Sequence, residues 1–375
     1  MSAQSTQDPQ PDLLYSEEEE ALRSAVRDLL ADRCDAGAVL ARIESPADGV
    51  PYDRGLWKAL ADGMGLAGLL VPQERGGQGA THREAAVVLE ELGRAVAPVP
   101  YLTSAVVATE ALLACTGSEA ADLLAALAAG RTVGALAVSL AVAPGAAFQR
   151  VRSAAGALHG ELTGIADASC ADVLLVPADG GLFAVDTAQD GVTVTPRTSL
   201  DLTRPLATVT FDGARARELA PDAGPAVLRA LRAGAALLAS EQLGLAEWCL
   251  TETVRYTKER KQFNRPVGSF QALKHRLAQL WLEVVNTRAA ARNAAGTLAA
   301  DGADADVAAA LAQAYAAPVA VRAAEEALQL HGGIGMTWEH PVHLRLKRAK
   351  ADSIAYGTAG RHREALAAQV DLRAP

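Results

Sequence analysis

Hydrophobic residues recur with a helical period over the first third of the chain. Leu22, Val26 and Leu30 fall on one stripe of a helix whose first turn is acidic. Ser16 directly precedes that turn and is the expected N-cap. The pattern predicts a helical zone over residues 14–131.

The pattern changes between residues 132 and 222, where short apolar runs are separated by Gly, Asp and Pro. This spacing is typical of the short strands of a small antiparallel barrel or sandwich. The expected strands are Gly134–Val138, Val173–Pro177, Leu182–Asp186, Val192–Pro196 and Ala207–Phe211.

Long stretches with few helix breakers follow from residue 223 onwards. They predict four helices, and helices of this length favour an antiparallel bundle. The expected helices are Ala226–Lys258, Phe270–Ala299, Ala303–His331 and Val342–Ala355. The predicted fold class is therefore α+β, with an N-terminal helical domain (14–131), a middle β domain (132–222) and a C-terminal four-helix bundle (223–375).

Composition and charge narrow the possible functions. Of the 375 residues, 50% are hydrophobic and 21% are charged, a balance typical of a folded globular protein. The formal net charge of -9 at pH 7 argues against binding to nucleic acid or to an anionic membrane, because both need clustered Lys and Arg. The longest Ala/Leu stretches are too short to span a bilayer, so no membrane insertion is expected.

The cysteines indicate a reducing compartment. Four of them, Cys34, Cys115, Cys170 and Cys249, are scattered and form no CxxC pair. Neither a disulfide framework nor a metal site is predicted, and the cytoplasm is the expected location. Residues 1–13 are rich in Gln, Ser, Asp and Pro without an apolar segment, which predicts a disordered leader rather than a signal peptide.

The most specific motif joins the first two predicted helices of the bundle. It has the order Arg-x-Gln-Phe-x-x-Pro-x-x-x-Phe-Gln and runs from Arg260 to Gln271. Cations that complement a helix dipole would explain its charge, but not this order. The segment resembles the signature of the acyl-CoA dehydrogenase family at the same place. The resemblance covers nearly the whole chain, including the order of its three zones.

A second segment, Gln329–Pro341, resembles the family's Gln-x-x-Gly-Gly-x-Gly-x-x-x-Glu sequence. The resemblance implies that FAD is the cofactor and that both segments reach across a subunit interface to the adenosine half of the neighbour's FAD. An Arg guanidinium suits a pyrophosphate, and a Gly-Gly backbone lets main-chain N–H groups approach closely. The cofactor-binding residues carried over in this way are Arg260, Gln262, Phe263, Gln271, Gln329, Gly332 and Gly333.

The catalytic base of the resembling family is missing. In that family a Glu removes the α-proton of an acyl-CoA while the β-hydride passes to the flavin. Many members place this Glu in Tyr-Glu-Gly-Thr, where this chain has Ala-Tyr-Gly-Thr with Tyr356 at the Glu position. Other members place it on the first bundle helix, where Gly234 stands here. A phenol with a reference pKa of about 10 is a poor base near neutral pH, so no catalytic residue is expected in this chain.

The motifs that face the flavin ring in the resembling family are also absent. Thr-Glu-x-x-x-Gly-Ser-Asp is replaced by Ser139–Ala146. Gly-x-Lys-x-Trp-Ile-Thr survives only as a frame, because Gly164 stands for its Trp and Ala166 for its Thr. On this chain an isoalloxazine would lose its stacking partner and its polar contacts.

The retained and the lost residues together predict a heteromer. A homologous acyl-CoA dehydrogenase subunit would supply the base and the flavin-ring contacts, and this chain would complete the partner's FAD site. One branch of the family forms α2β2 assemblies that act on bulky acyl-CoA thioesters such as steroid side-chain intermediates. The segment Gly332–Lys350 resembles that branch. The resemblance also implies an electron-transfer flavoprotein as electron acceptor.

Two alternatives stay open. The chain could be a self-sufficient homomeric flavoenzyme in which Asp352 or Tyr356 is a non-standard base, or a catalytically silent scaffold. The intact Arg260 and Gly332–Gly333 oppose a pure scaffold. His275 and His331 are interpreted as structural rather than catalytic, because neither stands in a motif with an orienting partner. Four cations are expected on a solvated helix face: Arg345, Lys347, Arg348 and Lys350.

Overall fold

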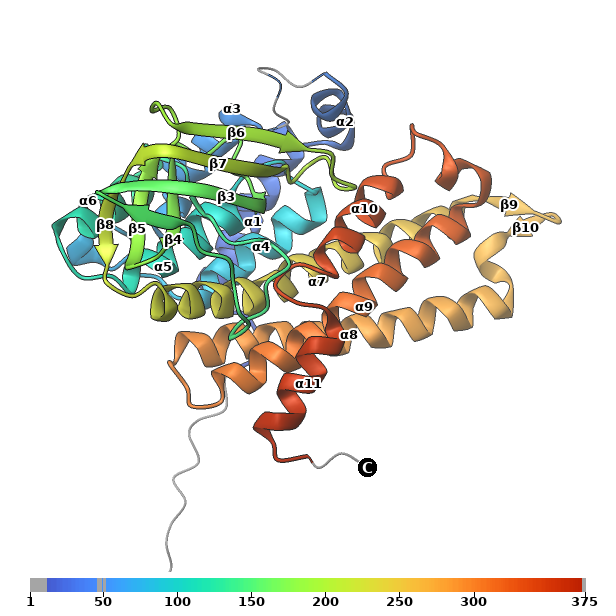
Figure 1. Cartoon of the computed structure of the whole chain (residues 1–375). Helices are drawn as coiled ribbons and strands as arrows, with labels where there is room; N and C mark the ends of the chain where they lie inside the picture. Colours follow the sequence, from blue (N-terminus) through green and yellow to red (C-terminus); the bar gives the residue numbers. More distant parts are fainter. Residues whose placement is uncertain (1–11, 46–48, 50–51, 373–375) are drawn as a thin grey trace, which may run out of the picture.

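Three layers of structure follow one another along the chain and pack side by side (Figure 1). The computed structural model describes residues 12–45, 49 and 52–372, so most of the expected leader lies outside the described residues. The predicted α+β class is confirmed, with helices first, two small sheets next and long helices last.

The first layer is helical and begins at the predicted cap. The Ser16 side chain accepts a hydrogen bond from the Glu19 N–H, and the Glu19 carboxylate accepts one from the Ser16 N–H, which confirms the N-cap as a capping box. The α-helices are α1 (Glu17–Arg33), α2 (Ala36–Glu44), α3 (Arg54–Lys58), α4 (His82–Ala95), α5 (Thr109–Leu113) and α6 (Ser118–Ala128). Shorter or wider helical turns span Ala59–Gly63, Leu66–Gly68, Gln73–Arg75 and Tyr101–Ala108.

The middle layer consists of two four-stranded sheets. One has the order β1-β4-β5-β8 and the other the order β2-β3-β7-β6. The paired strands are antiparallel except β1 and β4, which run parallel. The strands are β1 (Gly134–Leu136), β2 (Arg152–Ala154), β3 (Ala157–Ala166), β4 (Val173–Ala178), β5 (Gly181–Asp186), β6 (Val192–Arg197), β7 (Leu206–Arg215) and β8 (Arg217–Ala220). Their inner faces enclose a separate apolar core that includes Leu158, Leu174 and Phe211.

The last layer is the predicted bundle of long helices. These are α7 (Gly224–Glu259), α8 (Gln271–Ala299), α9 (Ala305–His331), α10 (Val342–Asp352) and α11 (Ala359–Gln369). On α7, a Cβ at Gly244 would lie 1.9 Å from the Glu90 carbonyl oxygen of α4, so this glycine allows the first and last layers to pack closely. The region Ala305–Met336 is long and apolar enough to cross a membrane, and 61% of its most apolar window is buried inside the structure.

The final helix differs from the expectation of one helix ending at Ala355. Tyr356 and Gly357 have positive φ angles of 52° and 103°, which end the helical path after α10. Thr358 then caps α11 by accepting a hydrogen bond from the Arg361 N–H. The Tyr-Gly-Thr segment is therefore a turn between two helices.

A short hairpin joins α7 to α8 and projects from the end of the bundle that lies away from the sheets (Figure 1). It consists of β9 (Lys261–Gln262) and β10 (Arg265–Pro266), paired antiparallel. Phe263 and Asn264 form its tip with φ angles of 51° and 60°.

Candidate functional site

The predicted cofactor-binding residues lie on the surface at this end of the bundle. Arg260 is the C-cap of α7 and Gln271 begins α8, and both are exposed. Gln262 and Phe263 belong to the hairpin, where the Phe263 side chain is 86% exposed.

The second predicted segment lies beside the first. Gln329 is exposed near the end of α9, and Gly332 is the C-cap of that helix. The Tyr256 ring on α7 stacks on the His331 ring at 4.5 Å between centroids, which joins the ends of the two helices. A Cβ built on Gly332 or Gly333 would meet no atom within 4 Å, so this backbone is open to an incoming group.

This edge of the bundle fits the adenosine half of FAD in chemical character. Arg260 carries a guanidinium, a group that can pair with a pyrophosphate, and the open Gly332–Gly333 backbone can approach an anion without a side chain in between. All seven predicted residues are exposed. A ligand held here would therefore lie outside this chain's own core.

Tyr356 and Gly234, which stand at the two expected positions of the base, contact each other in this chain. Tyr356 is 3% exposed, and its N–H donates to the Leu140 carbonyl at 2.6 Å. A Cβ on Gly234 would lie 3.0 Å from Tyr356 Cζ, so the ring packs on the bare helix backbone. Burial raises the pKa of Tyr356 above its usual value, so the hydroxyl stays protonated near neutral pH and no phenolate is available to remove a proton.

The space beside Tyr356 is too small for an acyl chain. A cavity of about 20 Å³ remains, which is close to the volume that one water molecule needs. Among the described residues its lining holds no carboxylate: Thr103, Val107, Leu136, Val138, Leu140, Ala166, Leu231 and Tyr356. The cavity therefore has neither the room nor the groups for α-proton removal.

The segment that was expected to face a flavin ring is closed as well. Gly164 has a φ of 75°, and a Cβ there would lie 2.8 Å from the Ser139 side-chain oxygen. The Gly164 carbonyl accepts a hydrogen bond from the Leu140 N–H at 2.9 Å, so the segment after β1 packs directly onto β3. The residues present do not fit an isoalloxazine at this position.

Asp352, the second alternative base, is held in a buried ion-pair network. Its side chain is fully buried, and one of its oxygens accepts from Arg204 at 2.8 Å. Arg204 also donates to both oxygens of Glu241, at 2.7 and 2.9 Å, and Arg348 donates to Glu241 at 2.6 Å and to Asp201. Asp352 does not line the cavity beside Tyr356.

The carboxylates of this network differ in pKa. Burial and the charge of Glu241 raise the pKa of Asp352 well above its usual range. Burial also acts to raise the pKa of Glu241, but the ion pairs with Arg204 and Arg348 hold it below its usual value. The network thus favours the ionised form more strongly at Glu241 than at Asp352.

The expectation of a solvated cationic face on α10 is wrong for two residues. Arg345 and Arg348 are only 4% and 2% exposed. Arg345 stacks on the Trp248 ring at 3.9 Å and donates to the Arg94 carbonyl. Lys350 is exposed as expected, and Lys347 is half-buried with its ammonium over the Trp338 ring. The anionic partners of Arg348 lie more than 100 residues away in sequence, which is why the helical pattern alone did not reveal them.

One buried carboxylate near the cavity was not among the predicted residues. Asp167 is 5% exposed and accepts a hydrogen bond from Thr103, which lines the cavity, at 2.6 Å. Burial raises its pKa to about 6. Its place directly after Ala166, in the former flavin-facing motif, is the signal that could have drawn attention to it.

Comparison with known families matches both helical layers. Residues 16–131 match the acyl-CoA dehydrogenase N-terminal domain, and residues 224–370 match the acyl-CoA dehydrogenase C-terminal domain. The chain is 36% identical to acyl-CoA dehydrogenase IpdE2 of Mycolicibacterium smegmatis over 91% of this chain and 95% of the relative.

Two solved structures of similar shape are complexes of two different chains by name. One is the ChsE4-ChsE5 complex from Mycobacterium tuberculosis, with a TM-score of 0.85 and 26% identity over 97% of this chain and 100% of the other. The other is a variant of the Tcur3481-Tcur3483 steroid ACAD, with a TM-score of 0.83 and 31% identity over 95% of this chain and 98% of the other.

Proposed function

This chain belongs to the acyl-CoA dehydrogenase family, whose members bind FAD, and on that premise we propose that it completes a partner subunit's FAD site without supplying the catalytic base. The reaction is α,β-dehydrogenation of an acyl-CoA thioester, in which FAD accepts the β-hydride. The partner is a homologous acyl-CoA dehydrogenase subunit that carries the base and the flavin-ring contacts.

The observation that carries the proposal is the contrast between the two ends of α7. Near its start, Tyr356 packs on Gly234 and leaves a cavity of about 20 Å³. At its end, Arg260 and the open Gly332–Gly333 backbone face outward. A chain in this form can bind the outer part of a cofactor whose reactive ring lies on another chain.

The contacts of this chain with the partner's FAD come from the hairpin, the start of α8 and the end of α9. Arg260 pairs with the pyrophosphate, and the backbone of the two glycines approaches the adenosine. Exposure of all the side chains concerned supports this assignment. The proposed cofactor-binding residues are Arg260, Gln262, Phe263, Gln271, Gln329, Gly332 and Gly333.

The similar chains support the substrate class and the assembly. The names of two structural neighbours describe complexes of two different chains, and one of them is a steroid ACAD. We assign a bulky, steroid side-chain-like acyl-CoA as the substrate and an electron-transfer flavoprotein as the acceptor. Four buried free cysteines are compatible with a cytoplasmic location.

The alternatives have less support. A self-sufficient enzyme would need a base, but Asp352 is paired with Arg204, Tyr356 has a raised pKa, and Asp167 lies behind Thr103 beside a cavity of about 20 Å³. A silent scaffold would not need the exposed arginine and open glycine backbone at one edge.

The test is the FAD content per chain, measured from visible absorbance for the protein alone and co-expressed with a homologous partner. We expect about half a flavin per total chain in the complex and none in the protein alone. Arg260→Ala should lower the flavin content of the complex, whereas Lys261→Ala, a charge loss at the next residue, should not. Near one flavin per chain in the protein alone would contradict the proposal.

A further inference from the structure

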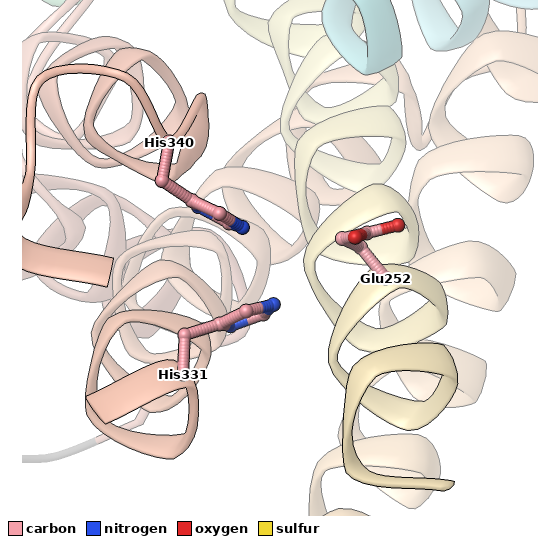
Figure 2. A group of neighbouring side chains, drawn as sticks. All are labelled: Glu252, His331 and His340. Atoms are coloured by element: carbon pink, nitrogen blue, oxygen red, sulfur yellow. The ribbon is translucent and has the colours of Figure 1, made fainter. Parts of the chain in front are cut away.

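Three side chains that can bind a metal meet beside the turn after α9 (Figure 2). Glu252 lies on α7, His331 is the last residue of α9, and His340 precedes α10. One ligand atom from each residue lies within 4.8 Å of those from the other two. Figure 2 shows both imidazole rings pointing toward the Glu252 carboxylate across one gap.

His331 is already oriented as a metal ligand would be. Its Nδ1 is hydrogen-bonded to the Ala327 carbonyl at 2.7 Å, which makes Nδ1 the protonated nitrogen and leaves a lone pair on Nε2. The side chain is 2% exposed, and Nε2 has no hydrogen-bond partner among the described residues. A buried nitrogen without a hydrogen-bond partner is rare in folded proteins, and a bound ion would give this nitrogen a partner.

His340 also offers a free ring nitrogen. Its Nδ1 accepts a hydrogen bond from the Val342 N–H at 3.4 Å, and its ring lies 4.4 Å from the His331 ring. The hydrogen bond at Nδ1 leaves Nε2 as the ring nitrogen that can bind an ion.

Glu252 supplies the negative charge of the cluster. Its carboxylate is paired with Arg255, whose side chain is 58% exposed and also pairs with Glu259. An exposed pair of this kind contributes little to stability, so Glu252 can exchange Arg255 for an ion. Arg345 adds a positive charge near His340, and the negative charge of Glu252 acts against it.

We propose that Glu252, His331 and His340 form a Zn²⁺ site. Two imidazole nitrogens and one carboxylate are a known ligand set for zinc, with water as the fourth ligand. In a tetrahedral zinc site with bonds of the usual length, the ligand atoms lie about 3.4 Å apart. The side chains must therefore move inward by about 1 Å from their positions here. Glu252 is only partly buried, so its side chain has the freedom to move.

The ion would fix the elements that carry the proposed cofactor contacts. His331 directly precedes Gly332, His340 ends the same turn, and Glu252 lies about two helical turns before Arg260 on α7. Zinc would therefore cross-link the end of α9, the following turn and α7. The turn that presents its backbone to the partner's FAD would be held in one conformation.

The test is zinc binding to the untagged full-length chain, measured by metal analysis after equilibrium dialysis and by the visible spectrum of the Co²⁺-substituted protein. We expect one Zn²⁺ per chain and a tetrahedral Co²⁺ spectrum. Glu252→Gln and His340→Asn should each weaken binding at least tenfold, since even loss of a residue that only supports a ligand has this effect. Both positions are partly exposed, so the variants should fold, which circular dichroism checks.

His343→Asn is the matched control, because His343 lies three residues from His340 but stacks on Trp338 outside the cluster. It should bind zinc as the wild type does. Absence of stoichiometric zinc in the wild type would overturn the proposal. Equal zinc binding by the wild type, Glu252→Gln and His340→Asn would also overturn it. The same holds if His343→Asn loses as much zinc binding as Glu252→Gln and His340→Asn do. The measurement needs no flavin, so its result does not depend on the proposed FAD role.

Discussion

The Tyr356 ring packs so closely on Gly234 that a side chain at residue 234 would require its neighbours to shift. A Cβ there would lie 3.0 Å from Tyr356 Cζ and 3.0 Å from Val107 Cγ2. These are the two positions at which the resemblance to the family leads us to expect a catalytic Glu.

Gly234→Ala should therefore destabilise the protein, although alanine is the better helix former. The added methyl group must displace the Tyr356 ring or the Val107 side chain, and overpacking of this kind costs about 1–3 kcal/mol. Urea denaturation measures the free energy of unfolding. In a double-mutant cycle with Tyr356→Ala, the cost of Gly234→Ala should shrink. Equal costs in both backgrounds would show that the two residues do not clash.

Tyr356→Phe should leave the activity of the heteromeric complex within about twofold of the wild type. The phenol has a raised pKa and lies beside a cavity without space for substrate, so it removes no proton. Steady-state kinetics of the complex, measured across pH 6–9, checks this. A large fall in kcat with an unchanged flavin content would identify Tyr356 as a base.

In the buried ion-pair network, replacing Arg204 should cost more stability than replacing Asp352. Arg204→Met leaves Glu241 without one of its two cations and should cost about 3–5 kcal/mol. Asp352→Asn should cost less than about 1 kcal/mol, because the raised pKa of Asp352 already favours a neutral side chain. Thermal or urea unfolding of the two variants compares them. Similar losses in both would mean that Asp352 is ionised.

Glu90 predicts a pH dependence of stability. Its carboxyl is 1% exposed and accepts a hydrogen bond from the Tyr15 hydroxyl, and burial raises its pKa from 4.5 to about 7. A raised folded-state pKa means that folding favours the protonated form, so stability falls as pH rises from about 4.5 through 7.

The Glu90→Gln variant has no ionisable group at this position, so it should not lose stability in this way as the pH rises. Relative to the wild type, the variant should gain about 1–3 kcal/mol of stability between pH 5 and pH 8. The free energy of unfolding at both pH values provides the measurement. A constant difference between the two proteins would show that Arg292, which lies 3.6 Å from the Glu90 carboxylate, keeps it ionised throughout.

Sequence patterns predicted the long elements well because these depend on local periodicity. The expected helix Ala226–Lys258 differs from α7 by two residues at its start and one at its end. Strand β3 was not predicted, since Gly160 and Gly164 both have positive φ and its register shifts near Gly164, which obscures the alternation of a strand.

Part of the candidate site was predictable because it, too, is local in sequence. The motif around Arg260 is continuous in sequence, so its residues could be named before their exposure was known. The contact between Gly234 and Tyr356, and the pairing of Arg348 with Asp201, join residues more than 100 positions apart. No local pattern records such contacts, and they were found only in the folded chain.

Helix α7 holds the contact between Gly234 and Tyr356 at a fixed distance from Arg260. Arg260 follows Gly234 by 26 residues, which corresponds to about 39 Å along the helix axis. A side chain at residue 234 is therefore too far from Arg260 to contact it. Under the proposed function, the length of α7 permits two homologous chains to divide a single active site between them.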